Sequence, residues 1–92
     1  MNAKIYLPEF TFEGVVVKGV DEREANQRIG EVSFICDGQS EVAVLEIDSC
    51  RRVSKNIENS ISKICIPAGS RVEFKVKKHL ENQGKAYNLQ II

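Results

Sequence analysis

The stretch that most constrains the fold of this chain runs from Ile66 to Lys78 and reads IPAGSRVEFKVKK. Its residues 67–69 predict a turn, because Pro fixes φ and Gly accepts the positive φ with which many turns end. From Arg71 onward, apolar and charged side chains alternate at a period of two residues, which is the pattern of a half-buried strand. The face toward the core is predicted to hold Val72, Phe74 and Val76. The opposite face holds Arg71, Glu73, Lys75 and Lys77, and Lys78 and His79 extend its positive end.

The rest of the sequence indicates one small globular domain. The chain has 92 residues, of which 42% are hydrophobic and 28% charged, as in folded rather than disordered proteins. Lys and Arg number 13, and Asp and Glu also number 13. Net charge therefore gives no reason to expect nucleic-acid binding, and a site would have to arise from local segregation of charge. No apolar run is long enough for a signal peptide or a membrane-spanning helix, so we expect a cytoplasmic protein.

The three cysteines, Cys36, Cys50 and Cys65, are far apart in the sequence and form no CxxC pair. A single His does not complete a zinc site at the usual spacings. We therefore expect reduced, mostly buried thiols without a disulfide or a metal.

Three strands are predicted before the basic strand. The first begins as an alternation at Ala3, is interrupted by Pro8 and bends at Gly14, since Gly within a strand pattern suggests a bulge. Such a bent strand can contribute to both sides of a small barrel. After a polar loop over residues 21–29, a second strand spans Gly30–Cys36, with its inward side chains at Val32, Phe34 and Cys36. The Asp37-Gly38 pair predicts a tight hairpin into a third strand, Glu41–Ile47.

A helix and a last strand complete the predicted order. Apolar residues between Cys50 and Ile64 recur at spacings of three and four, which predicts a helix after the third strand. Residues 79–84 predict a turn, and Lys85–Ile92 a final strand. Its alternation groups Tyr87 with Leu89 and Ile91, which favours core packing for Tyr87. Asn88 and Gln90 lie on the other face, where their amides are suited to contacts with bases or sugars.

The predicted fold class is mainly β: a five-stranded OB-fold-like barrel with one short helix between strands three and four. This order is the one expected of the OB-fold, a Greek-key barrel that binds oligonucleotides and oligosaccharides. Another small β-barrel, including an SH3-like one, fits the same pattern.

Three stretches, NAKIYLPEFTFEG, SKICIPAGSRVEFKV and GKAYNLQII, cover roughly half of the chain. With this element order, the chain resembles the single-stranded-DNA-binding proteins of filamentous bacteriophages, the gene V protein type. The resemblance implies a small OB-like homodimer without enzymatic activity that coats single strands during replication in the cytoplasm of a bacterial host. It implies no cofactor.

Candidate nucleic-acid-binding residues form two basic groups and a pair of aromatic rings. The first basic group is on the predicted strand, and the second is at the start of the predicted helix. Single-strand binders combine such positive grooves with stacking platforms, here the two tyrosines. The candidates are Arg71, Lys75, Lys77, Lys78, Arg51, Arg52, Lys55, Tyr6 and Tyr87. Tyr6 falls outside the predicted core face.

Two functions remain open from the sequence. The first is single-stranded-DNA binding, and the second is a protein-interaction module in which the same charges are only a solvated surface; lysines on a strand can also serve to block edge pairing. An oligosaccharide-binding role is a further alternative. No catalytic constellation, Walker loop or HExxH motif is present, so we expect no enzyme.

Overall fold

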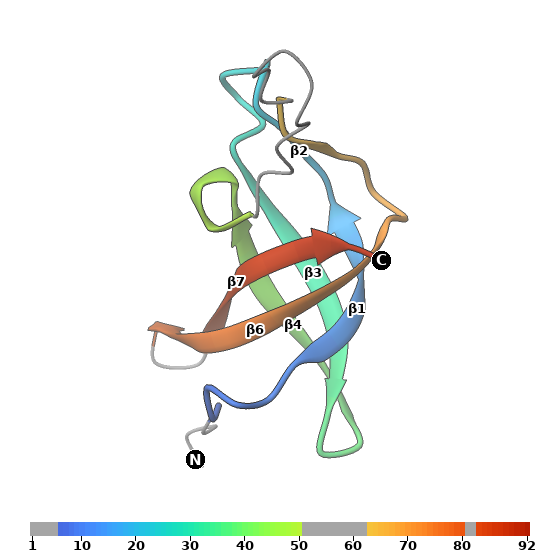
Figure 1. The fold of residues 1–92 in the computed structure, drawn as a ribbon, viewed down its shortest axis with the longest axis vertical. Helices are drawn as coiled ribbons and strands as arrows, with labels where there is room; N and C mark the ends of the chain where they lie inside the picture. Colours follow the sequence, from blue (N-terminus) through green and yellow to red (C-terminus); the bar gives the residue numbers. More distant parts are fainter. Residues whose placement is uncertain (1–5, 51–62, 81–82) are drawn as a thin grey trace, which may run out of the picture.

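The computed structural model describes residues 6–50, 63–80 and 83–92. Within these residues the chain forms a closed barrel of five strands (Figure 1). The order around the barrel is β1-β3-β4-β7-β6, with β6 pairing back onto β1. Neighbouring strands are antiparallel except β4 and β7, which are parallel. The strands are β1 (Phe12–Lys18), β3 (Ile29–Cys36), β4 (Gln39–Glu46), β6 (Arg71–Leu80) and β7 (Gln83–Ile91). The expected mainly-β, five-stranded OB-like barrel is therefore confirmed.

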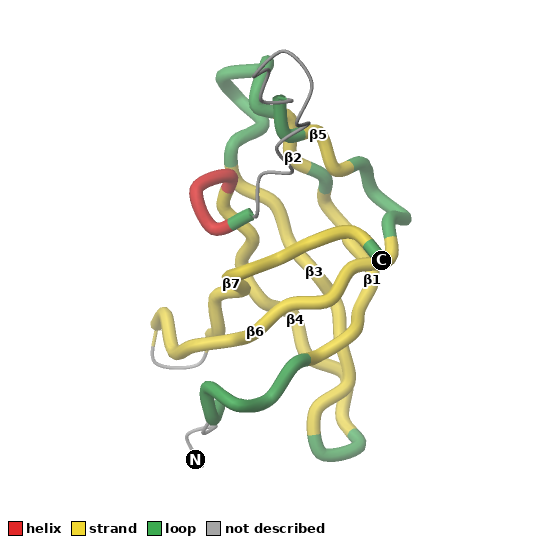
Figure 2. The backbone as a smooth tube through the Cα atoms, viewed as in Figure 1, coloured by secondary structure: helices red, strands yellow, loops and turns green. Residues whose placement is uncertain are grey.

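A second, two-stranded sheet lies at one end of the barrel (Figure 2). It consists of β2 (Val20–Asp21) and β5 (Cys65–Ile66). A single 3-10 turn, η1 (Ile47–Ser49), follows β4. The predicted helix falls almost entirely on residues 51–62, which lie outside the described residues. Its predicted start at Cys50 is wrong, because Cys50 has an extended backbone and bridges to Leu89 of β7.

The first strand is shorter than its sequence pattern suggested. The predicted alternation from Ala3 is wrong over the described residues 6–11, which form no strand. A turn at Pro8 and Glu9 interrupts it, and the Phe10 amide donates a hydrogen bond to the Leu7 carbonyl at 3.0 Å. From Phe12 on, β1 pairs with β3 along one edge and with β6 along the other, as expected of a strand that contributes to both sides of the barrel.

Gly14 has a different role from the one predicted. The irregularity in the β1–β3 register lies between Val16 and Lys18, not at Gly14. A Cβ atom on Gly14 would lie 2.2 Å from the Ser33 carbonyl oxygen and 3.1 Å from the Phe74 ring. Gly14 therefore permits a close approach between β1, β3 and the core aromatics.

The β3–β4 hairpin matches its prediction closely. Asp37 and Gly38 have positive φ values of 53° and 78°, and their flanking residues pair directly, as in a two-residue type I′ hairpin. Val32 and Phe34 are buried and Cys36 is half-buried, so this face points inward as expected.

The core lies inside the barrel and is built around three phenylalanines. Ring centres of Phe12 and Phe34 are 5.0 Å apart, and those of Phe34 and Phe74 are 5.4 Å apart. Val72 and Val76 flank Phe74 and are almost fully buried. The period-two prediction for β6 is thus confirmed, and its charged face points out of the barrel. The strand continues to Leu80, so the predicted turn at 79–84 begins too early.

A bulge in β7 reverses the expected alternation of its side chains. Lys75 pairs with Tyr87 and Glu73 pairs with Gln90, so β7 has one residue more than β6 between these pairs. Asn88 has a φ of 57° at this point, which is a conformation that Asn tolerates better than most residues. As a result Leu89 is buried and Tyr87 shares the outer face with Lys75. The prediction that Tyr87 packs in the core with Leu89 is wrong.

Candidate nucleic-acid interface

Charge is strongly segregated on this neutral chain. The β3–β4 hairpin, residues 29–46, contains no Lys or Arg and four carboxylates. By contrast, β6 and β7 together have only one carboxylate, Glu73, beside five cations: Arg71, Lys75, Lys77, Lys78 and Lys85. These two strands are paired neighbours on one side of the barrel (Figure 1). In OB-folds the second and third barrel strands form a common binding face. Here these strands are β3 and β4, and they are acidic. The basic face lies instead on β6 and β7.

The four predicted cations of β6 differ in their local partners. The Lys75 ammonium donates a hydrogen bond to the Pro8 carbonyl at 2.6 Å and is half-buried. The Arg71 guanidinium lies 3.9 Å from the Glu13 carboxylate, and both side chains are largely exposed. Such an exposed pair is weak in water. Lys77 and Lys78 are exposed, so they are the cations of β6 most accessible to phosphates. Lys77 shares the outer face with Lys75, whereas Lys78 alternates onto the other side of the strand.

The two tyrosines exchange the roles expected from the sequence. Tyr6 packs against the hydrophobic core, and its ring meets that of Phe12 edge-on, with centres 6.4 Å apart. Its predicted place outside the core is therefore wrong. Tyr87 lies on the outer face of β7, and the Lys77 ammonium is 5.4 Å from the centre of its ring. The structure thus brings Tyr87 together with Lys75 and Lys77, and not with Tyr6.

A shallow pocket of about 100 Å³ lies beside this group of residues. Its polar walls come from β6 and the β7 bulge, and the segment before β1 contributes Thr11. Gln90 donates a hydrogen bond from Nε2 to Oε1 of Glu73 within it. The full lining is Thr11, Glu73, Phe74, Lys75, Asn88 and Gln90. The sequence predicted that the amides of Asn88 and Gln90 contact a ligand. It did not predict Thr11 and Glu73 as part of this site, because alternation within one strand does not show which other segments lie beside it.

The second basic group, Arg51, Arg52 and Lys55, lies outside the described residues. Lys85 of β7 adds a cation that the sequence reasoning did not select. Its ammonium lies 2.7 Å from the Glu46 carboxylate on β4. This hydrogen bond from Lys85 is the main cause that lowers the pKa of Glu46, and the pair ties the basic β7 to the acidic β4.

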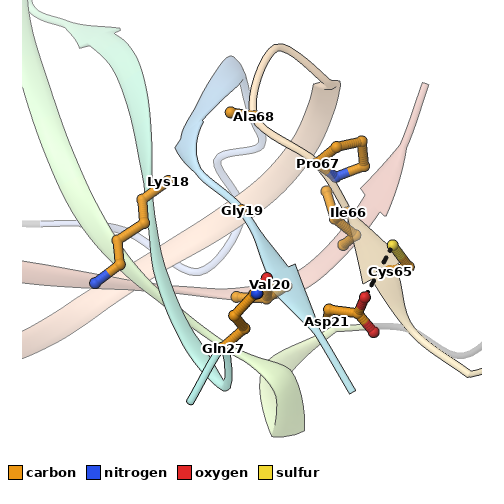
Figure 3. A pocket seen from close by; sticks show the side chains of 9 residues that line it. All are labelled: Lys18, Gly19, Val20, Asp21, Gln27, Cys65, Ile66, Pro67 and Ala68. Atoms are coloured by element: carbon orange, nitrogen blue, oxygen red, sulfur yellow. Dashed lines mark hydrogen bonds between the residues drawn. The ribbon is translucent and has the colours of Figure 1, made fainter. Parts of the chain in front are cut away.

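A larger pocket, of about 470 Å³, lies against the two-stranded sheet of β2 and β5 (Figure 3). Cys65 lines it, with its sulfur 3.7 Å from Oδ2 of Asp21. The Arg23 guanidinium binds both oxygens of the Asp21 carboxylate, at 3.0 and 2.9 Å. These hydrogen bonds lower the pKa of Asp21 to about 2. The Asp21 carboxylate in this pocket is therefore already engaged by Arg23.

The thiols differ in exposure from the expectation. None of the three thiols, Cys36, Cys50 and Cys65, is in a disulfide or fully buried, and Cys65 is exposed. In the described ranges, no three His, Cys, Asp or Glu side chains are grouped so as to hold a metal ion. The same residues include no helix with the length and apolar character needed to cross a membrane.

Comparisons of the chain with protein-family models, with curated proteins and with solved structures found no match.

Proposed function

We propose that this chain is a non-enzymatic, single-stranded-DNA-binding protein of the OB type, similar to the gene V proteins of filamentous phages. It would coat or protect single strands during replication in a bacterial cytoplasm, as a homodimer and without a cofactor. The observation that supports this most directly is Tyr87, an outward-facing ring with Lys77 over it and Lys75 opposite it. Aromatic rings among cations are the components of a surface that stacks bases and follows phosphates.

Charge segregation removes the main objection to this function. A chain with no net charge is not drawn to a polyanion as a whole, but a pair of neighbouring strands that holds five cations and one carboxylate is. The acidic β3–β4 hairpin repels phosphates and confines a strand to the β6–β7 face. Stacking on the neighbouring base pairs covers the faces of the bases in a duplex, so stacking on Tyr87 favours single strands.

A fluorescence-anisotropy titration with oligo-dT and with a duplex, repeated at several salt concentrations, tests this function. If about four phosphates are neutralised, a log–log slope of about −0.7 per phosphate predicts a roughly 50-fold loss of affinity between 50 and 200 mM salt. No binding at low salt would contradict the proposal, and a salt-insensitive complex would contradict its mechanism.

A charge-reversal variant with a matched control locates the surface. Lys77→Glu plus Lys78→Glu changes two exposed side chains on β6 and is expected to abolish most single-strand binding. Lys18→Glu plus Lys63→Glu makes the same charge change at exposed positions near β2 and β5 and is expected to have a much smaller effect. Equal losses in both variants would mean that bulk charge, not this face, governs binding.

A second function is supported by an apolar outer surface on β1, β3 and β4. Val15 and Val42 both pair with Ser33 from opposite sides, and Ile35 is two residues further along β3 on the same face. Val42 is 46% exposed and Ile35 62% exposed. Contiguous exposed apolar side chains often mark a protein contact. Two results together would favour the interaction-module function instead. The wild type would bind no DNA, and Val42→Asp would abolish self-association or binding of a protein partner.

A further inference from the structure

Glu73 is out of place on a surface that binds phosphates. It is the one carboxylate of β6 and β7, and it points outward between Arg71 and Lys75. On β1 it is paired with another carboxylate residue, Glu13, and on β7 with Gln90. A negative charge at this position weakens the attraction for the phosphate backbone of a nucleic acid. We therefore expect Glu73 to contact a group of the ligand other than phosphate. Donors on the edge of a base are such groups.

The pocket beside Tyr87 presents Glu73 together with hydrogen-bond donors. Gln90 donates to Oε1 of Glu73 and thereby orients the carboxylate. Lys75 and Asn88 line the same pocket, and the Lys75 ammonium, which donates to the Pro8 carbonyl, has two further N–H donors. At about 100 Å³ the pocket has room for one edge of a base rather than for a whole nucleotide. Asn88 directly follows Tyr87 in the bulge, so the pocket adjoins the proposed stacking ring.

We propose that this pocket reads the Watson–Crick edge of one unpaired guanine, with Glu73 as the specificity-determining residue. This inference rests on the proposed single-strand binding. Single strands expose these edges, and proteins read them by hydrogen bonds next to a stacked ring. Guanine presents two adjacent donors, N1–H and the N2 amino group, which a carboxylate accepts together. Its O6 is an acceptor for Lys75 or Asn88.

The other bases fit the same groups less well. Thymine has one N–H donor, which lies between two carbonyl oxygens. A carboxylate that accepts from this donor is repelled by the carbonyl oxygens beside it. Adenine and cytosine each offer an amino group beside a ring nitrogen whose lone pair faces the second carboxylate oxygen. Only guanine therefore donates to both oxygens of the Glu73 carboxylate. Oε1 can accept from guanine in addition to Gln90, because each carboxylate oxygen has two lone pairs. The surface would be a general single-strand binder with a preferred base at one position.

The test compares short oligonucleotides that differ at one position, with dT at every other. We expect dTTGTTT to bind roughly five- to tenfold more tightly than dTTTTTT, at the lower end of the discrimination that a bidentate base contact gives. Inosine in place of guanine lacks the N2 amino group and is expected to lose most of this gain. Equal affinity for the guanine and thymine oligonucleotides would overturn the inference.

Two variants assign the effect to the pocket. Glu73→Gln retains an acceptor for Gln90 but loses the paired acceptor set, so guanine preference is expected to disappear while dTTTTTT binds as well or better. Glu13→Gln removes the neighbouring carboxylate on β1 and is expected to keep the preference. Preference that survives Glu73→Gln in a protein with a wild-type circular dichroism spectrum would overturn the assignment. Failure of the wild type to bind any of these oligonucleotides would contradict the proposed function itself, and this inference with it.

Discussion

The Lys77 ammonium lies 5.4 Å from the centre of the Tyr87 ring. The contact joins neighbouring strands, and the extra residue in β7 lets the Tyr87 ring lie on the outer face while Leu89 is buried. A cation over a ring face is favourable by roughly 0.5–1 kcal/mol at an exposed site. For the proposed function, this contact sets a cation suited to a phosphate beside a ring suited to base stacking.

Removal of the Tyr87 ring is expected to weaken single-strand binding. Stacking of a base on an aromatic side chain contributes about 1–3 kcal/mol, so Tyr87→Ala should lower affinity for oligo-dT roughly tenfold, and Tyr87→Phe should retain it. Anisotropy titrations measure both. Tyr6→Phe is the control, since Tyr6 packs on the core. Equal binding by Tyr87→Ala and the wild type would show that the ring is not a stacking platform.

Much of the barrel was predictable because its strands obey a simple period. The inward set of β6, the Asp37-Gly38 turn and the β3 alternation all follow from local sequence. Each is set by one rule, burial on alternate residues or a positive φ, that needs no knowledge of distant strands. The basic outer face of β6 was predictable for the same reason.

The rest depended on contacts between distant parts of the chain. The bulge at Asn88 is defined by the pairing of β7 with β6, and no local pattern marks it. Because one extra residue reverses alternation, Tyr87 was misassigned to the core. Likewise Tyr6 is placed by its contact with Phe12, in a segment that the turn at Pro8 removes from β1. The aromatic residue of the candidate site is therefore Tyr87 and not Tyr6, whereas the cations on β6 are those that the sequence predicted.

Close packing at Gly14 predicts a large effect from a single methyl group. Gly14→Ala would bring Cβ to 2.2 Å from the Ser33 carbonyl oxygen, a backbone atom that moves only if β3 moves. Overpacking of this kind costs about 1–3 kcal/mol of unfolding free energy. Chemical denaturation measures the loss, with Ser40→Ala on exposed β4 as a control expected to stay within about 0.5 kcal/mol. A neutral Gly14→Ala would mean that β1 and β3 separate easily.

Stability is expected to depend on pH through Asp21. Hydrogen bonds from Arg23 lower the pKa of Asp21 from 3.8 to about 2 in the folded state. The unfolded chain therefore takes up the proton first as pH falls, so the stabilisation is complete above about pH 4 and is lost as pH falls through 2. The difference in melting temperature between the wild type and Asp21→Asn should shrink over this window.

A second variant isolates the cause of this pH dependence. Arg23→Gln removes the guanidinium that binds Asp21 and is expected to return the pKa of Asp21 toward its usual value. Titration of the Asp21 carboxyl by NMR measures the change directly. An unshifted Asp21 in the wild type would contradict the ion pair between β2 and the loop that follows it.

The last prediction concerns assembly. The resemblance to the phage proteins implies a homodimer, and a two-fold axis would give one assembly two copies of the basic face. Lys75 is less suitable for charge reversal than Lys77 and Lys78, because its ammonium bonds the Pro8 carbonyl. Lys77→Glu plus Lys78→Glu is therefore expected to leave a folded dimer that binds single strands weakly. Light scattering and circular dichroism test dimer and fold, and a monomeric variant would place these lysines in the protein interface instead.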